Sequence, residues 1–553
     1  MYQHYKKDFM AFTRQMVMIL GGSQGYAQQE DGITAFGLFK RMQQENIKAD
    51  KVTILGALKC CASVGAVLQA MQLHHNVCHD GLEADMLLGS SLVDVYAKLV
   101  CLKEAGVVFS GLQSLDVVSC SAMISGYVQQ GLWFQSINLY DLMVQKNIKP
   151  DNISFACVLK ACCQIGVIND CKLLHDQIIR VDLNSDVLVG NALVDMYAKC
   201  GRLPEARYVF NTLPARTLAS WNTIMTGYAD NDDGFQVFEL FELLQRKGLV
   251  ANRVSYLSVL KASSSLGSIV HGFFIHDQIV RNSLEADLVV SNMMVDTYAR
   301  CGGLKEARAV FGSLPNRNVV SWSALIAGYA QHRGLESAQH YLHGMLQSGV
   351  NPVSKTFTSI LGACSNGGQV EDGHYYFRLM REEYGIAPSI EHCNCMIDIL
   401  GRAGCLEDGQ KFLHSMPILP NIATWMSLLT SCRTFGDIEF GRLCFKQANK
   451  LNPYNSSAYM IMSKIYADAN MWTEVRKLEE ARKQGFAWKK PGKAFIEVSG
   501  KVYQFTAGEK NLQWASGICA KPQFLVRMLK EKGYVPASDS VLETEVEVVA
   551  CCS

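Results

Sequence analysis

The feature that most constrains this chain is an internal period of 101 residues. The segment at 188–216 returns at 289–317 and, in a shorter form, from Leu87, without a gap in the step. Repetition of this kind is the signature of an array in which each structural unit packs mainly on its neighbours. A Gly-Tyr pair keeps the same step four times, at Gly25-Tyr26, Gly126-Tyr127, Gly227-Tyr228 and Gly328-Tyr329.

Each 101-residue stretch contains three shorter units of 35, 35 and 31 residues, for example 117–151, 152–186 and 187–217. Within a unit, two apolar-periodic stretches flank a break that contains glycine, which is typical of two short helices joined by a tight turn. Such a hairpin cannot bury its apolar stripe alone, so neighbouring hairpins must stack. The predicted fold class is all-α, an α-solenoid superhelix of helical hairpins.

The composition limits how such an array can bind a partner. The 52 Lys and Arg residues against 51 Asp and Glu leave a formal net charge of +1, which lacks the basic excess of a protein that grips phosphates mainly by charge. Hydrophobic residues make up 49% and charged residues 19% of the chain, which excludes a disordered protein. The longest apolar runs stop well short of the roughly 18 residues of a membrane span, so no membrane partner is expected.

The 20 cysteines are scattered and are interpreted as reduced thiols that fill the core. His392, Cys393 and Cys395 fall on the first turn of one predicted helix without a second ligand pair, which does not favour a zinc site. The sequence has no phosphate-binding glycine loop and no nucleophile motif. We therefore expect no catalytic residue, no metal, no cofactor and no small-molecule substrate.

Several segments resemble the pentatricopeptide repeat proteins of plant organelles, in the subfamily with alternating P, L and S units. They include "SWNTIMTGYA" (220–229), "SWSALIAGYA" (321–330) and "NALVDMYAKCGRLPEARYVF" (191–210). A tetratricopeptide array has a similar period, but its Trp-Leu-Gly-Tyr and Pro pattern is missing. By this resemblance, P units begin at Met16, Val117, Leu218 and Val319, L units at Lys51, Asn152, Arg253 and Ser354, and S units at Met86, Val187, Leu288 and Ile390.

The resemblance divides the chain into four parts. Residues 1–15 are a short leader, interpreted as a transit-peptide remnant or the start of a truncated gene model, and 16–421 hold about 12 units. Residues 422–489 resemble paired E motifs, and 490–553 an E+ or PG-box-like extension and tail. Independently of the resemblance, alternating apolar residues predict a β-hairpin with strands Phe495–Val498 and Lys501–Phe505 around Ser499-Gly500.

The resemblance also implies which residues would read RNA, one helical hairpin for each unstacked base. In this family the fifth and the last residue of a unit contact the base edge, and the second residue wedges beside the base. Carried over to this chain, the reading pairs are Ser90/Asp116, Ser121/Asp151, Asn191/Thr217, Asn222/Asn252, Asn292/Asn318, Ser323/Val353 and Asn394/Asn421. The wedge positions include Leu87, Val118, Leu188, Ala219, Val289 and Val320.

The residue types predict base preferences. By resemblance, a hydroxyl beside a carboxylate favours guanine, because the carboxylate accepts from the exocyclic amine and the ring N–H. The two Ser/Asp pairs are therefore expected to read guanine, and the three Asn/Asn pairs pyrimidines. Asn191/Thr217 is expected to read pyrimidines more weakly. Because Val353 gives Ser323 no polar partner, this pair is expected to show at most a slight preference for purine.

L units are poor readers in the family, and here Leu55, Ala156 and Leu257 occupy their fifth positions, so these units are expected to act mainly as spacers. Leu20 makes the first P unit degenerate as well. A competing interpretation applies to all the polar positions. Asn, Ser and Thr near a helix start are common N-caps, which serve the backbone alone.

Many relatives end in a cytidine-deaminase-like DYW domain, whose zinc needs His-x-Glu and Cys-x-x-Cys. Neither motif follows the predicted hairpin here. The resemblance thus implies a site-recognition factor, not an enzyme, for C-to-U editing of single-stranded organellar RNA, with a DYW-type deaminase and other editing-complex proteins acting in trans. The alternatives are a factor in RNA splicing, stability or translation, and a protein-interaction scaffold or inactive relic. Mitochondria are favoured over chloroplasts.

Overall fold

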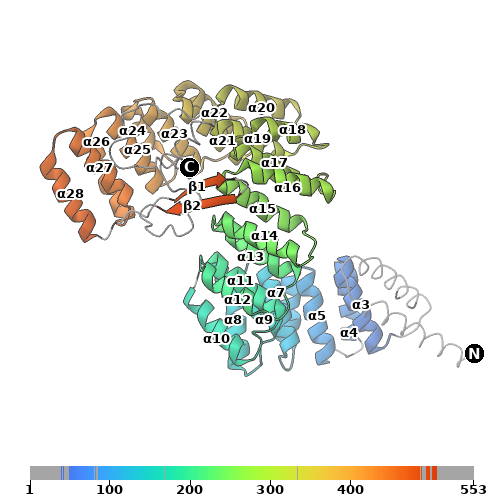
Figure 1. The fold of residues 1–553 in the computed structure, drawn as a ribbon. Coiled ribbons are helices and arrows are strands. Elements are labelled where there is room, and N and C mark those ends of the chain that lie inside the picture. The colour runs from blue at the N-terminus through green and yellow to red at the C-terminus, as the bar shows by residue number, and fades with distance from the viewer. Residues whose placement is uncertain are drawn as a thin grey trace, which may run out of the picture. The chain divides into compact units, whose positions relative to one another are not determined.

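The computed structural model describes residues 39, 42, 49–79, 81, 85–166, 168–332, 334–485, 487, 493–498 and 501–506. The predicted leader, the unit start at Met16, Leu20, Gly25-Tyr26, the Ser499-Gly500 turn and the tail beyond Thr506 lie outside these residues. The chain divides into two compact units, Met1–Ala251 and Asn252–Ser553. Each consists of helix pairs that follow one another in order of sequence (Figure 1), which confirms the predicted all-α solenoid of hairpins.

In the first unit, each described hairpin joins a first helix of 13 or 14 residues to a second helix of 10 or 13 residues. The first helices are α3 (Lys51–Val64), α5 (Met86–Lys98), α7 (Val117–Gln129), α9 (Asn152–Ile165), α11 (Val187–Lys199) and α13 (Leu218–Asp230). The second helices are α4 (Val67–His79), α6 (Leu102–Gly111), α8 (Trp133–Gln145), α10 (Ile168–Arg180), α12 (Leu203–Thr212) and α14 (Gly234–Arg246).

The second unit continues the same pattern. Its first helices are α15 (Arg253–Leu266), α17 (Leu288–Arg300), α19 (Val319–Gln331), α21 (Ser354–Gly367), α23 (Ile390–Arg402), α25 (Ile422–Phe435) and α27 (Ser456–Asp468). Its second helices are α16 (Ile269–Arg281), α18 (Leu304–Ser313), α20 (Leu335–Gln347), α22 (Val370–Glu382), α24 (Leu406–Ser415), α26 (Ile438–Leu451) and α28 (Trp472–Gln484).

A two-stranded antiparallel sheet follows α28 in the chain. Its strands are β1 (Lys493–Val498) and β2 (Lys501–Thr506), with Val498 paired to Lys501 across the turn. This is the hairpin that alternating apolar residues predict. The first strand starts two residues earlier than expected and the second ends one residue later.

Helix capping explains where the first helices begin. Each described first helix of the array starts at the residue predicted to open a unit, from Lys51 to Ile390. The residue just before it is Asp, Asn, Thr or Ser in every described case except Val353. Asp50, for example, accepts a hydrogen bond from the backbone N–H of Thr53 at 2.8 Å. Such caps satisfy backbone donors that have no partner inside the helix.

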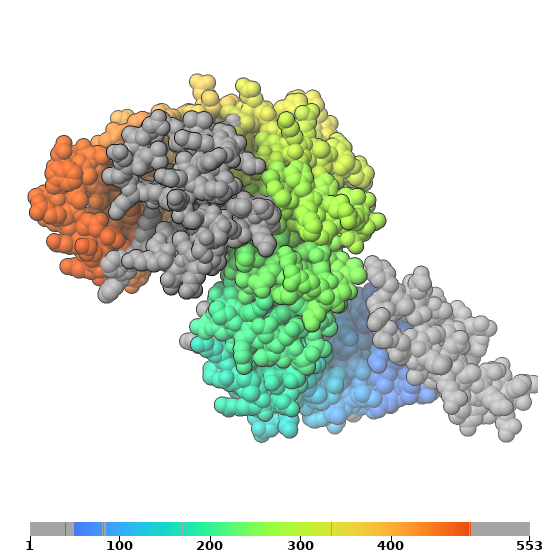
Figure 2. All heavy atoms as spheres, in the orientation of Figure 1, coloured from blue at the N-terminus to red at the C-terminus, as the bar shows by residue number. Residues whose placement is uncertain are grey.

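The first helices form a continuous layer within each unit. Each packs against its own second helix and against the first helix of the next hairpin. In Figure 1, α20 and α22 accordingly lie along the upper edge of the second unit, with α19 and α21 beneath them. The space-filling view shows the hairpins of each unit as bands in sequence order (Figure 2). Among the described helices, none has the length and apolar character needed to cross a membrane.

The repeated Gly-Tyr pair marks a close approach between first helices. A Cβ atom added at Gly227 would lie 2.5 Å from the Cβ of Ala198, on the preceding first helix, and Gly328 faces Ala299 in the same way. No side chain larger than hydrogen fits at this distance without a shift of one helix. The period in the sequence therefore records a packing requirement.

Replacing this glycine tests the packing directly. Gly227→Ala is expected to lower the free energy of unfolding by about 1–3 kcal/mol, because the added methyl group overlaps Ala198. Gly106→Ala in α6 is the control, since a Cβ there meets nothing within 4 Å. The control should raise stability by up to about 1 kcal/mol through helix propensity. Urea denaturation of both variants gives the comparison, and equal effects would contradict the packing account.

Candidate functional site

Two of the predicted reading pairs join a hydroxyl to a carboxylate. The Oγ of Ser90 lies 3.0 Å from both carboxylate oxygens of Asp116, and the Oγ of Ser121 donates to Oδ1 of Asp151 at 2.8 Å. In each pair the serine comes from the first helix of one hairpin and the aspartate directly precedes the next hairpin. Stacking of hairpins therefore brings together residues that are 26 and 30 positions apart.

Two further pairs join amides in the second unit. Nδ2 of Asn292 donates to Oδ1 of Asn318 at 3.4 Å, and Nδ2 of Asn394 donates to Oδ1 of Asn421 at 3.4 Å. Four of the seven predicted pairs are thus in direct contact.

The other three predicted pairs are Asn191/Thr217, Ser323/Val353 and Asn222/Asn252, and each is a separate case. The hydroxyl of Thr217 lies 3.2 Å from that of Ser220, and Oδ1 of Asn191 is buried without a hydrogen-bond partner among the described residues. Val353 offers Ser323 no polar group. Asn222 and Asn252 belong to different compact units, so this pair stays a prediction.

The last residue of each pair is also a helix N-cap, as the competing interpretation proposes. Asp116, Asp151, Thr217, Asn252, Asn318 and Asn421 all accept backbone N–H groups of the helix that follows. Capping does not exclude a second role, because each amide or carboxylate has another polar atom. The cap instead decides which atom remains for a ligand.

The caps fix the orientation of the asparagine amides. Oδ1 of Asn318 accepts the N–H groups of Val320 and Ser321, both at 3.0 Å, and Oδ1 of Asn421 accepts the N–H of Thr424 at 3.0 Å. Only the amide oxygen can accept these protons, so the Nδ2 donor must point away from the helix end. An asparagine cap therefore presents a hydrogen-bond donor.

An aspartate cap presents the opposite group. The hydrogen bonds to the carboxylate of Asp151, from Ser121, from the N–H of Ser154 and from its hydroxyl, all end on Oδ1. Oδ2 is left as an acceptor with no partner among the described residues. Substituting Asn for Asp at a cap thus changes the presented atom from an acceptor to a donor while the helix stays capped.

The predicted wedge positions lie on the surface next to these pairs in the chain. Ala219 is exposed, and the five larger apolar side chains are between 44% and 54% exposed, namely Leu87, Val118, Leu188, Val289 and Val320. Large apolar residues exposed at one repeated position indicate a binding surface more than scattered exposure does.

The L units share this feature, which the sequence interpretation missed. Val52, Ile153 and Val254 are the second residues of three L units and are 51%, 45% and 44% exposed. The signal was present in the sequence, because these positions are apolar in the same phase. Judging L units by their fifth residues, and treating them as spacers, overlooks their apolar second residues.

A groove of about 460 Å³ runs across the first helices α19, α21, α23 and α25. Its lining includes Asn394, one of the predicted readers, and side chains from four consecutive hairpins. No residue of a second helix lines it. The first-helix layer of the second unit is therefore hollowed beside the predicted reader Asn394.

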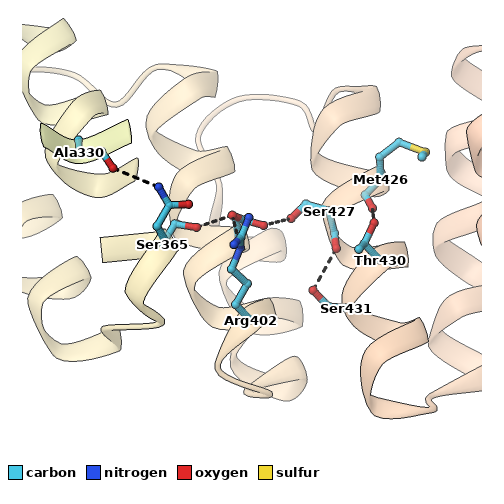
Figure 3. A network of polar contacts seen from close by, with 9 residues as sticks. Ala330, Ser365, Arg402, Met426, Ser427, Thr430 and Ser431 are labelled. Carbon is cyan, nitrogen blue, oxygen red and sulfur yellow. Dashed lines mark hydrogen bonds and ion pairs between the residues drawn. The ribbon is translucent and has the colours of Figure 1, made fainter. Parts of the chain in front are cut away.

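A carboxylate ties three of these helices together at the groove. Oδ2 of Asp398 accepts from the hydroxyl of Ser365 and from Nε of Arg402, the latter at 2.8 Å, and Oδ1 accepts from the hydroxyl of Ser427 at 2.9 Å. Figure 3 shows Ser365, Arg402 and Ser427 reaching toward this common centre from α21, α23 and α25. The network holds the three helices that carry Asn394 and its surroundings in register.

The groove offers no reactive thiol. Cys395 lines it, but burial raises the pKa of this thiol to about 12, so it stays protonated at neutral pH. His392 is fully buried, with Nδ1 accepting the N–H of Ser389 at 3.0 Å and Nε2 2.8 Å from the carbonyl oxygen of Ser354. Over the described part of the chain, no group of three His, Cys, Asp or Glu side chains is suited to a metal.

Comparison with known proteins decides the family. A PPR repeat model matches residues 24–47, 191–216, 219–249, 289–319, 355–384 and 391–418, and related repeat models match 115–164 and 316–367. A mitochondrial pentatricopeptide repeat-containing protein of Arabidopsis thaliana is 33% identical over 93% of this chain and 81% of its own length. The chain belongs to the pentatricopeptide repeat family.

Further matches describe this pentatricopeptide repeat chain more closely. An E motif model matches residues 435–497. The chloroplastic CRR2 protein of Arabidopsis thaliana is 33% identical over 88% of this chain and 75% of its own length. The chain spans 63% and 52% of the length of two other Arabidopsis relatives. The crystal structure of maize PPR10 covers 88% of this chain and 82% of its own at 15% identity, with a TM-score of 0.40.

Val353 makes the capping account testable. It is the one described residue before a first helix of this pentatricopeptide repeat array that lacks a polar side chain, and α21 has no side-chain cap. Val353→Asp is expected to raise the free energy of unfolding by about 1 kcal/mol, because a carboxylate can accept the N–H groups of the first turn. Val353→Ala, which adds no acceptor, is the control. A thermal midpoint no higher for the aspartate variant than for the alanine variant would contradict the account.

Proposed function

We propose that this protein binds one stretch of single-stranded RNA along its first helices and marks a cytidine there for C-to-U editing. The observation that carries the proposal is the repeated juxtaposition of two polar side chains from consecutive hairpins. It occurs at Ser90/Asp116, Ser121/Asp151, Asn292/Asn318 and Asn394/Asn421. In three of these four units an exposed apolar side chain occupies the second position.

The presented atoms match the predicted base preferences. Oδ2 of Asp151 is an acceptor, and the Watson–Crick edge of guanine offers two neighbouring donors, the ring N–H and the exocyclic amine. Nδ2 of Asn318 and of Asn421 is a donor, and both pyrimidines offer O2 as an acceptor on that edge. The chemistry therefore favours guanine at aspartate caps and pyrimidines at asparagine caps.

Affinity would come mainly from these base contacts and from apolar contact with the base faces. The formal net charge of +1 leaves little nonspecific attraction for phosphates. Basic side chains do recur on the first helices of S units, at Lys98, Lys199, Arg300 and Arg402, each 38% to 55% exposed and paired with an aspartate four residues earlier. An RNA phosphate can share such a cation, which would position the strand without selecting its sequence.

The units together define a target pattern. From the unit at Met86 to the unit at Ile390, the ten successive hairpins would take G, G, any base, pyrimidine, pyrimidine, any base, pyrimidine, a purine-leaning position, any base and pyrimidine. The unread positions fall on L units. In two of these L units the exposed residues Ile153 and Val254 would hold a base without selecting it.

The editing role is supported by the E motif match at residues 435–497. The relatives named above carry mitochondrial and chloroplastic names, which supports an organellar location, and we propose the mitochondrion. The 553 residues contain no His-x-Glu and no Cys-x-x-Cys, the zinc and proton-transfer motifs of cytidine deaminases. A DYW-type deaminase acting in trans, with other editing-complex proteins, would therefore supply the chemistry.

Exchange of two reading pairs tests RNA selection. The double variant Ser121→Asn/Asp151→Asn is expected to lose its preference for guanine at one RNA position and gain one for pyrimidine, because an acceptor becomes a donor. Asn292→Ser/Asn318→Asp should change the preference in the opposite direction at a position five nucleotides away. Fluorescence anisotropy with short RNAs that vary one base at a time measures both. A preference that stayed the same in both variants would contradict the reading positions.

Loss of the gene product tests the editing role. Sequencing of organellar transcripts from plants without the protein should show at least one cytidine that is no longer converted to uridine, downstream of a sequence that fits the pattern. Transcript abundance and splicing at that locus should be unchanged. A defect in splicing or abundance with all edits intact would favour the alternative role in RNA processing.

A further inference from the structure

In the second unit, each of the two amide reading pairs contacts a buried hydroxyl side chain on the first helix of the following hairpin. Oγ of Ser321 donates to Oδ1 of Asn292 at 2.6 Å, and Oγ1 of Thr424 donates to Oδ1 of Asn394 at 2.5 Å. Ser321 and Thr424 have no exposed surface. Each is the third residue of the unit that follows the reader.

The serine readers have the same neighbour. The hydroxyl of Ser121 lies 2.8 Å from that of Ser154, and the hydroxyl of Ser323 lies 2.7 Å from that of Thr356. Ser154 and Thr356 are again the third residues of the following units and are fully buried. The contact is therefore a recurring feature of the stacked hairpins.

A hydroxyl occupies this third position after every predicted reader. After a unit whose fifth residue is one of the seven predicted readers, the third residue is always Ser or Thr, namely Ser119, Ser154, Ser220, Ser255, Ser321, Thr356 and Thr424. After the L units with Leu55, Ala156 and Leu257, it is Leu88, Val189 and Val290. A hydroxyl thus follows each of the seven predicted readers. It also occurs at Thr53, after Leu20, whereas Thr358, the fifth residue of the fourth L unit, is followed by His392.

Helix capping does not explain this distribution. The helices α5, α11 and α17 are capped by the side chains of Asp85, Asp186 and Asp287, although their third residues are Leu or Val. A cap therefore needs no hydroxyl two positions into the helix. The hydroxyl has a second task where it contacts the reader of the preceding unit, at Ser121, Asn292, Ser323 and Asn394.

That task is to fix the fifth residue. Oδ1 of Asn292 is held by Ser321, so its Nδ2 faces Asn318 and the surface where a base would lie. Without the hydroxyl, the amide can rotate and present oxygen in place of nitrogen. Asn191 shows the looser arrangement, because its Oδ1 has no hydrogen-bond partner in the described part of the chain and Ser220 instead lies against Thr217.

We propose that the third residue of each unit is a positioning residue for the base read by the unit before it. The inference rests on the proposed RNA recognition and deepens it, because base choice then depends on three side chains from two hairpins. For the last pair, Asn394/Asn421, the positioning residue Thr424 lies on α25, in the segment predicted as an E motif. That segment therefore completes the final reader.

Three variants of the full chain test the proposal. Ser321→Ala removes the hydroxyl but leaves the backbone N–H that Asn318 caps, and Ser321→Thr keeps a hydroxyl. Thr53→Ala is the matched control, since Thr53 bonds its cap Asp50 but follows Leu20, which is no reader. The probe is a set of short RNAs that differ only at the position responding to the Asn292/Asn318 exchange, and the readout is the ratio of purine to pyrimidine Kd.

Ser321→Ala should reduce this ratio by about fivefold, the equivalent of one ordinary hydrogen bond. Ser321→Thr and Thr53→Ala should keep the wild-type ratio. A ratio unchanged in Ser321→Ala, or a uniform loss of affinity for all bases, would overturn the positioning role while RNA recognition stood. A wild-type protein without any base preference at this position would overturn the proposed function and this inference together.

Discussion

Everything in this molecule depends on the junction where the N-cap of one hairpin meets the first helix of the hairpin before it. Asp116, Asp151, Asn318 and Asn421 start a helix with one side-chain oxygen and at the same time contact the fifth residue of the preceding unit. Local helix formation and the stacking of neighbours therefore use the same side chain. At these four junctions one residue serves both purposes.

This double use restricts the chemistry that the array can present. Only side chains with an acceptor can cap, so Asp, Asn, Ser and Thr are the residues available at the position. Among these, Asp leaves an acceptor and Asn leaves a donor for a ligand. Selectivity for a base would thus arise from the atom that capping does not consume. Val353 shows the alternative, in which a helix begins without a side-chain cap and the unit offers no second polar group.

The sequence predicts the fold well because its signals are local. The period, the glycine-containing breaks and the capping residues set the helix starts, and the structure places them from Lys51 to Ile390 where expected. The Gly227 and Ala198 contact explains why the period is so regular. Such packing follows from neighbouring units, so it leaves a direct trace in the repeat.

The candidate site is only partly predictable. That Ser121 meets Asp151 follows from aligned units, but the failure of Thr217 to meet Asn191 depends on a hydroxyl turning toward Ser220. Oδ1 of Asn292 likewise accepts a hydrogen bond from Ser321, a contact between residues 29 positions apart. No periodicity encodes which atom of an amide faces a groove.

The most direct measurement is a structure of the full chain bound to an RNA that carries the predicted pattern. We expect a guanine with its Watson–Crick edge within hydrogen-bond distance of Oδ2 of Asp151, and its faces between Val118 and Ile153. A strand that followed the second helices, or a base at this unit without contact to Ser121 or Asp151, would contradict the central claim that capping side chains select the RNA sequence.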